Sequence, residues 1–212
     1  DGVPGVPPAH VVVVGGGMVG TGAIRRAVGL GARVTVLDVS VDRLRYLGEI
    51  FMGHIETLYS NNYNMTQAIK SADLVIGAVL IPGSKTPKLI TEEMVKQMEP
   101  GSVIVDVAID QGGCVATIDK PTTHENPIFV KYGVLHYAVP NIPGAVPQTA
   151  TLALTNNTIS YALKIANKGW KKALKEDASL AKGANVVNGK ITYKGVAETF
   201  NLEYTPIEDL LN

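Results

Sequence analysis

Three glycines and one aspartate have the spacing of a dinucleotide-binding site. Gly15, Gly17 and Gly20 fit the pattern G-x-G-x-x-G, directly after the four valines of 11–14. In such a site the first glycine makes the turn out of a strand, and the second lets the backbone approach a pyrophosphate. The third lets the next helix pack close to the strand. Asp38 follows Gly20 by 18 positions, close to the spacing of the acid that binds a ribose 2′-hydroxyl.

The carboxylate of Asp38 favours NAD over NADP, because it accepts hydrogen bonds from ribose hydroxyls and repels a 2′-phosphate. The alternative for Asp38 is an N-cap of the next helix. Arg43 lies five residues further on. An arginine there can hold a 2′-phosphate, or it can lie along the adenine.

Three further stretches are expected where strands of a parallel sheet end, which is where such sheets bind ligands. Val79 and Leu80 can cover a ribose or ring, or can simply end a strand. Asp110 can assist proton transfer or orient a water. Before Gly112 it can equally form a turn, and on the residues alone the turn is favoured. Asn141 can bond a carboxamide or make an Asx-turn.

The remaining reactive side chains are expected to be structural. None of the histidines pairs with a serine or cysteine in a nucleophile pattern; they are His10, His54, His124 and His136. Cys114 reads as a small loop residue, and Lys85 and Lys88 as solvated side chains. No cysteine or histidine spacing indicates a metal site.

The elements that position these residues predict an α/β fold of the doubly wound, Rossmann type. Six apolar segments alternate with helical ones and predict a six-stranded parallel sheet in the order 3-2-1-4-5-6. These strands are expected at 11–14, 33–37, 55–58, 74–80, 102–107 and 134–139. Residues 1–148 are thus expected to form a dinucleotide-binding domain, and 149–212 a C-terminal helical segment. About 60 residues of helix are too few for a stable core of their own.

Composition limits the possible partners. The chain has 212 residues, with 19 Lys and Arg against 19 Asp and Glu. This balance gives no reason to expect binding to nucleic acid or an anionic membrane. No apolar run reaches the roughly 18 residues of a membrane span, and no signal peptide is visible. A single cysteine excludes a disulfide within the chain, so we expect the cytoplasm as the compartment.

Several longer motifs resemble bacterial alanine dehydrogenase over nearly the whole chain. They are GVPGV (2–6), GGGMVG (15–20), LYSN (58–61), GAVLIPG (77–83), VDVAIDQGGC (105–114), PTTHENP (121–127), VPNIPGAVP (139–147) and ALTNNT (153–158). The resemblance implies NAD-dependent, reversible oxidative deamination of L-alanine to pyruvate and ammonia. It also implies a homo-oligomer, a hexamer in the family.

The resemblance assigns roles to individual positions. Asp110 matches the catalytic aspartate of the family, against the turn that its neighbours favour. Met18 and Val19 match contacts at the pyrophosphate, within the loop of Gly15, Gly17 and Gly20, and Asp38 matches the contact at the adenosine ribose. The other implied NAD contacts are Arg43 and Ser60 near the adenine, then Val79, Leu80, Val107, Ala108, Ile109, Asp110, Lys120, Val139, Pro140, Asn141 and Ile142.

The family has an additional N-terminal region that supplies the substrate-binding Arg and Lys and the catalytic His. This sequence shows no counterpart of them, so the resemblance implies the cofactor half of a dehydrogenase, inactive alone. Residues 149–212 would belong to an incomplete substrate domain. The alternative is a non-catalytic NAD(H)-binding module similar to the α subunit of transhydrogenase, against which the run AIDQGGC (108–114) argues.

Overall fold

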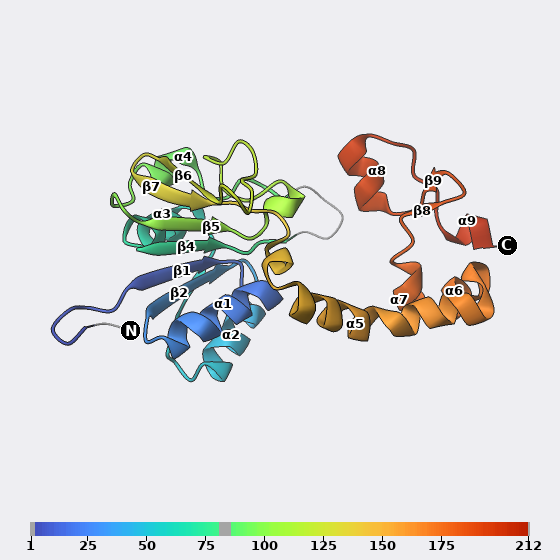
Figure 1. Cartoon of the computed structure of the whole chain (residues 1–212), viewed down its shortest axis with the longest axis horizontal. Helices are drawn as coiled ribbons and strands as arrows, with labels where there is room; N and C mark the ends of the chain where they lie inside the picture. The colour runs from blue at the N-terminus through green and yellow to red at the C-terminus, as the bar shows by residue number, and fades with distance from the viewer. Residues whose placement is uncertain (1–2, 81–85, 212) are drawn as a thin grey trace. The chain divides into compact units, whose positions relative to one another are not determined.

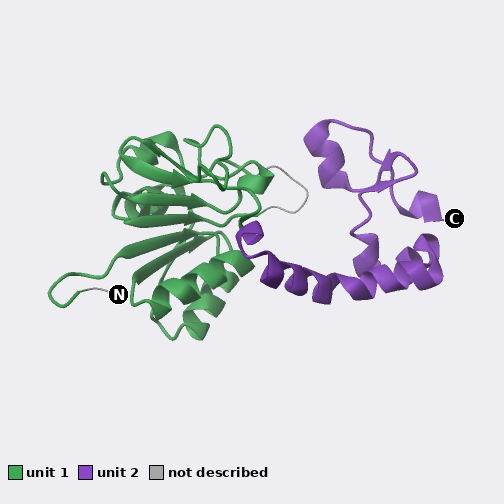
Figure 2. Cartoon of the chain, viewed as in Figure 1, with its two compact units in different colours: residues 1–80, 86–142 green, residues 81–85, 143–212 purple. Residues whose placement is uncertain are grey.

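The computed structural model describes residues 3–80 and 86–211. Two compact units are present (Figure 2). The first comprises the residues up to 80 together with 86–142, and the second begins at 143. The motif residues 81–83 and Lys85 lie outside the described residues.

The first unit is built on one seven-stranded sheet in the order β3-β2-β1-β4-β5-β7-β6 (Figure 1). Every pairing is parallel except that of β6 with β7. The strands are β1 (His10–Val14), β2 (Arg33–Asp38), β3 (Glu56–Tyr59), β4 (Leu74–Gly77), β5 (Val103–Asp106), β6 (Ile128–Lys131) and β7 (Val134–Tyr137). The predicted fold class and the order of the six parallel strands are confirmed.

Helices cover both faces of this sheet (Figure 1). Val11 and Val13 share a core with residues of α1 (Met18–Gly29) and α2 (Val41–Ile50). Val12 and Val14 pack instead among residues of α3 (Asn62–Lys70) and α4 (Glu92–Val95). The side chains of β1 alternate between two buried faces, which is why its sequence is apolar throughout.

The predicted count of six strands is wrong, because the sequence analysis assigned no element to β6. This strand is an antiparallel edge strand that precedes β7. Tyr132 and Gly133 join the two strands with φ angles of 56° and 76°. A turn with two positive φ angles suits a tight hairpin, but tyrosine rarely adopts it, so no turn signal marks the position.

Asn64 and Gln67 have the spacing of a capping box, but α3 begins before them. The N-cap is Asn61, whose side chain accepts a hydrogen bond from the amide of Asn64. The helix therefore begins at Asn62, three residues before the start that a cap at Asn64 would give.

The second unit is mostly helical. Its elements are η2 (Ile142–Ala145, at the junction with the first unit), α5 (Pro147–Lys168), α6 (Trp170–Glu176), α7 (Ala178–Ala181), β8 (Val186–Val187), β9 (Lys190–Ile191), α8 (Lys194–Phe200) and α9 (Glu208–Leu211). The helical segment 170–182 is divided at Asp177, whose side chain caps α7. Asn188 and Gly189, both with positive φ angles, form the turn between β8 and β9. None of the helices described here combines the length and apolarity that crossing a bilayer requires.

The longest of these helices, α5, has no buried residue. Its large apolar side chains are exposed, among them Leu154 at 65% and Leu163 at 53%. Apolar surface of this extent favours association.

We expect the 212-residue chain to self-associate through α5. Replacing Leu154 and Leu163 with lysine should weaken association about tenfold or more, because charge replaces apolar contact. Sedimentation velocity over a concentration series measures this. A control with Thr151 and Asn156, both exposed on α5, changed to lysine should associate nearly as the parent does. Equal behaviour of the two variants would show that α5 is not the contact.

Candidate functional site

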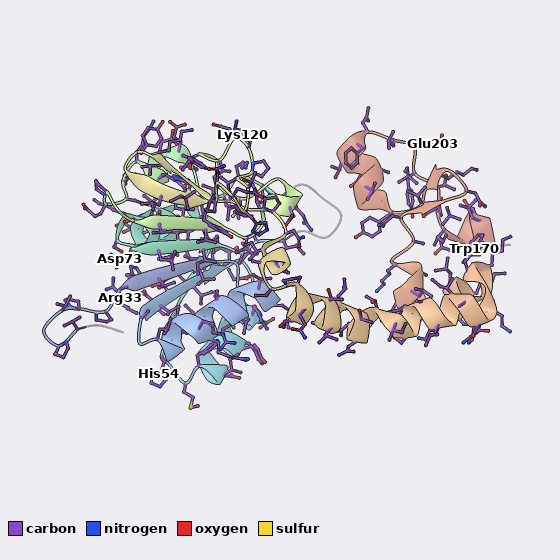
Figure 3. All side chains as sticks on the ribbon, viewed as in Figure 1. Arg33, His54, Asp73, Lys120, Trp170 and Glu203 are labelled. Atoms are coloured by element: carbon purple, nitrogen blue, oxygen red, sulfur yellow. The ribbon has the colours of Figure 1, made fainter. Side chains whose placement is uncertain are left out.

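The parallel strands bring their carboxyl ends to one edge of the sheet. Three backbone hydrogen bonds join consecutive ends there. The amide of Gly15 donates to Leu37 (2.8 Å), that of Ala78 to Val14 (2.8 Å) and that of Val107 to Gly77 (2.9 Å). The loops after these strands are therefore neighbours. The amino ends of the strands lie on the opposite side, where Figure 3 labels Arg33, at the start of β2, and Asp73, just before β4.

The glycines after β1 are required by close approaches. Gly15 has a φ of 100°, and a Cβ on it would lie 2.8 Å from the carbonyl oxygen of Ala78. A Cβ on Gly20 would lie 1.9 Å from the carbonyl oxygen of Gly15, so α1 could not pack as it does with any other residue there. Nothing lies within 4 Å of the corresponding position on Gly17. The loop thus packs tightly against the protein at Gly15 and Gly20 but leaves open space beside Gly17. That space is where a pyrophosphate would lie at the start of α1.

Met18 and Val19 begin α1 at this open side and are exposed. Gly17, as N-cap, has no side chain to accept from their amides. The first amides of the helix are therefore available to an anion.

Asp38 joins the end of β2 to the glycine loop. Its Oδ2 accepts a hydrogen bond from the amide of Gly16 (2.8 Å), and its Oδ1 accepts one from the amide of Ser40 (2.9 Å). Asp38 does not cap α2, because the side chain of Ser40 does so. Each carboxylate oxygen keeps a second lone pair with which to accept from a hydroxyl.

Arg43, on α2, binds the same glycine loop and the start of α1. Its Nε donates to the carbonyl of Gly16 (2.6 Å) and its Nη2 to the hydroxyl of Thr21 (2.7 Å). The guanidinium also lies 5.0 Å from the ring centre of Tyr46. Thr21 was not singled out from the sequence, because its partner is 22 residues away and leaves no local pattern. Ser60 follows β3, and its amide donates to the carbonyl of Asp38 (2.9 Å).

Asp110 and Asn141 meet at the ends of β5 and β7. Asp110 lies exposed on the short helix η1 (Ile109–Gln111). Its Oδ1 accepts a hydrogen bond from the backbone amide of Asn141 (3.0 Å), which has a φ of 50°. The sequence indicated each residue separately, and the structure brings them together. Lys120 lies apart on an exposed stretch (Figure 3).

The other predicted contacts line the same loops. Val79 is half-buried and Leu80 exposed after β4. After β5, Val107 is half-buried, while Ala108 and Ile109 are buried. After β7, the remaining positions are Val139, buried, and Pro140 and Ile142, both half-buried.

A second aspartate, Asp106, lies under the Asp110 loop. It is fully buried at the end of β5 and accepts hydrogen bonds from the amides of Ala108 (3.1 Å), Cys114 (2.9 Å) and Val115 (3.1 Å). Burial raises the pKa of Asp106, and these hydrogen bonds partly oppose that rise. Burial also raises the pKa of the Cys114 thiol to about 12, so the thiol stays protonated and unreactive.

Lys88 is exposed, as expected, but it also binds the loop that follows β5. Its Nζ donates to the carbonyls of Gly112 (2.8 Å) and Val115 (3.0 Å). These carbonyls lie 24 and 27 residues away, so no local pattern shows the contacts.

Two histidines belong to the interior. His10 bonds to the hydroxyl of Thr35 (2.9 Å), and His136 bonds to that of Thr117 (2.8 Å) and stacks on Phe129. Burial lowers the pKa of His136. In the part of the chain that the structure describes, no cluster of His, Cys, Asp or Glu could hold a metal ion.

Comparison with known proteins identifies the family. A family model described as alanine dehydrogenase/PNT, C-terminal domain, matches residues 1–194. The chain belongs to this family. An alanine dehydrogenase of Methanococcus maripaludis is 62% identical over 211 residues, covering 100% of this chain and 57% of that relative. The chain thus spans little more than half the length of the relatives that it matches.

Solved structures agree with this assignment. A structure of L-alanine dehydrogenase superposes with a TM-score of 0.84 at 52% identity, covering 94% of this chain and 55% of that one. A transhydrogenase from Sinorhizobium meliloti has a TM-score of 0.69 at 27% identity, covering 89% of this chain and 51% of that one. The similarity to alanine dehydrogenase is the stronger of the two.

Two glycines of α1 provide a matched test of the loop. Gly20→Ala should destabilise the fold by about 3 kcal/mol, because its Cβ has no room beside Gly15. Gly22→Ala should stabilise it by up to about 1 kcal/mol, because nothing lies within 4 Å and alanine favours helix. Urea denaturation measures both. Similar stabilities of the two variants would mean that the close approach at Gly20 does not hold α1 in place.

Proposed function

We propose that this chain binds NAD, and that the protein to which it belongs oxidises L-alanine to pyruvate and ammonia. The Asp38 carboxylate carries the cofactor assignment. It lies beside the open glycine loop and already accepts from the Gly16 amide, so it is fixed where an adenosine ribose would lie. A 2′-phosphate at the same place would meet a fixed negative charge.

The site residues fit NAD along the edge of the sheet. Gly15, Gly17, Met18, Val19 and Gly20 would hold the pyrophosphate, and Asp38 the ribose. Arg43 and Ser60 would lie near the adenine. Around the nicotinamide we place Val79, Leu80, Val107, Ala108, Ile109, Asp110, Val139, Pro140, Asn141 and Ile142. Lys120 lies apart from this group, and only the resemblance implies its contact with NAD. When bound, NAD supplies the acceptor for the hydride from the Cα of alanine.

Asp110 is the residue proposed to act in the reaction. Loss of a proton from the ammonium group and of a hydride from Cα leaves an iminium, and water must add to its carbon before ammonia can leave. The Asp110 carboxylate would orient this water and take its proton. The backbone amide of Asn141 fixes the Asp110 carboxylate by donating to Oδ1 (3.0 Å). Because Asp110 is exposed, its carboxylate stays accessible to a water.

The substrate assignment rests on the relatives, which are named alanine dehydrogenase and are longer than this chain. We infer that their additional residues supply the groups that bind the alanine carboxylate. We further infer an assembly of several copies, supported by the uncovered apolar side chains of α5. The single, buried Cys114 supports a cytoplasmic location.

A second candidate is a non-catalytic NAD(H)-binding module like that of a transhydrogenase. The similarity to the Sinorhizobium meliloti structure supports it, but the identity there is only 27%. An assay of hydride transfer by the complete protein distinguishes the two functions. NADH formation from alanine supports the dehydrogenase, and transfer between NADPH and NAD without alanine supports the module.

The chain should bind NAD at least tenfold more tightly than NADP, a difference of about 1.4 kcal/mol. Asp38→Ala should weaken NAD binding and narrow this ratio, because it removes both the acceptor and the negative charge. Calorimetric titration of parent and variant with each dinucleotide measures the four affinities. Equal affinities of the parent for NAD and NADP would contradict the assignment of Asp38.

Asp110→Asn in the complete enzyme should lower kcat about 100-fold or more. NAD affinity should change little, because the amide keeps the size and one acceptor of the carboxylate. Steady-state kinetics with alanine and a separate NAD titration give the two quantities. Turnover near that of the parent would return Asp110 to the role of a turn-forming residue.

A further inference from the structure

The loop 107–115 is tied to a single buried side chain. Asp106, with an exposed fraction of 0%, has backbone donors on both of its carboxylate oxygens. Oδ1 accepts from Ala108, and Oδ2 accepts from Cys114 and Val115. One donor precedes Asp110 and two follow it, so the loop is closed around the carboxylate at both ends.

The packing leaves little freedom for this arrangement. Gly113 has a φ of 72°, and a Cβ on it would lie 2.5 Å from Oδ2 of Asp106. A Cβ on Gly77 of β4 would lie 2.3 Å from the sulfur of Cys114. The end of the loop therefore rests directly on the neighbouring strand and on the carboxylate, and small residues are needed at both contacts.

Lys88 holds the same loop from outside. Its Nζ donates to the carbonyls of Gly112 and Val115, and its positive charge favours ionised Asp106. The two side chains thus bind opposite backbone groups of one segment, Asp106 its amides and Lys88 its carbonyls. Asp110 lies between the two sets of contacts, on η1.

We propose that Asp106 is a positioning residue for Asp110, acting through the backbone of 107–115. The inference rests on the proposed catalytic role of Asp110. Asp106 itself is too deeply buried to touch substrate or cofactor. By fixing the loop at both ends, it holds the Asp110 carboxylate at the place where the amide of Asn141 meets it. A displacement of about 1 Å at such a group can lower turnover by about 100-fold.

Asp106→Asn is the direct test, because asparagine matches aspartate in size but has only one acceptor oxygen. Its amide group must face at least one of the three backbone donors, so one end of the loop loses its contact. In the complete enzyme kcat should fall about 10- to 100-fold, while the KM for NAD changes less than about threefold.

A double-mutant cycle with Asp110→Asn shows whether the effect passes through Asp110. If Asp106 acts only by positioning Asp110, Asp106→Asn should lower kcat less than about threefold further in the Asp110→Asn background. If the reductions in kcat caused by Asp106→Asn and Asp110→Asn multiply in the double variant, Asp106 acts in some other way and the proposal is wrong. An unchanged kcat in the single variant Asp106→Asn would overturn it as well.

A control variant, Thr35→Val, and the single variant Asp110→Asn separate the possible failures. Thr35→Val removes a fully buried hydroxyl on β2, away from the loop, and should leave kcat within about twofold. An equal fall in kcat there would show that any buried polar loss has this effect, which would overturn the proposal. If Asp110→Asn alone leaves kcat unchanged, the proposed role of Asp110 is the part that fails.

Lys88→Met covers the case in which Asp106→Asn does not fold. Lys88 is exposed, so its loss should not prevent folding, yet it removes the two contacts to the carbonyls of the loop. We expect a fall in kcat of about 3- to 10-fold that disappears in the Asp110→Asn background. No fall, or a fall that multiplies with Asp110→Asn, would contradict positioning of the loop.

Discussion

The hydrogen bond from the amide of Gly16 to Asp38 joins two parts of the chain on which the proposed cofactor site depends. It links the loop after β1 to the end of β2 across 22 residues. Without it, the relative position of the glycine loop and Asp38 would depend only on the packing of separate strands. With it, the two form one rigid corner, to which Arg43 adds a further link through the carbonyl of Gly16.

The other end of the site also has an aspartate that accepts hydrogen bonds from the backbone amides of a loop. Asp106, at the end of β5, binds backbone amides of a glycine-containing loop as Asp38 does at the end of β2. The difference is burial. Asp38 remains partly exposed and keeps lone pairs for a ligand, whereas Asp106 is fully enclosed and has only the loop to bind. In the proposed function, Asp38 would therefore contact the ligand directly, and Asp106 would set the position of the neighbouring Asp110 carboxylate that does so.

Local patterns in the sequence predict much of this arrangement. The valines of β1, the spacing of Gly15 to Gly20 and the acid at the end of β2 each have a local physical cause, so the fold class and strand order follow from them. The strand β6 does not follow, because its turn uses Tyr132 in a conformation that tyrosine rarely adopts.

Contacts between distant residues are the other part that the sequence does not reveal. Thr21 and Lys88 each bond to partners more than 20 residues away, and nothing in their own neighbourhood marks them. The strand expected at 102–107 contains Asp106 and not Asp110, yet only the structure shows the three backbone amides that Asp106 binds. Burial and pairing across the sheet are properties of the folded chain.

We propose that these 212 residues form the cofactor half of a dehydrogenase. The most direct test is a titration of the pure chain with NADH, followed by an assay for NADH formation from NAD and L-alanine. We expect saturable binding of one NADH per chain and no NADH from alanine, because the described residues include no evident clamp for a substrate carboxylate. Failure to bind NADH would contradict the cofactor site, and NADH formed from alanine would show that the chain contains a substrate site of its own.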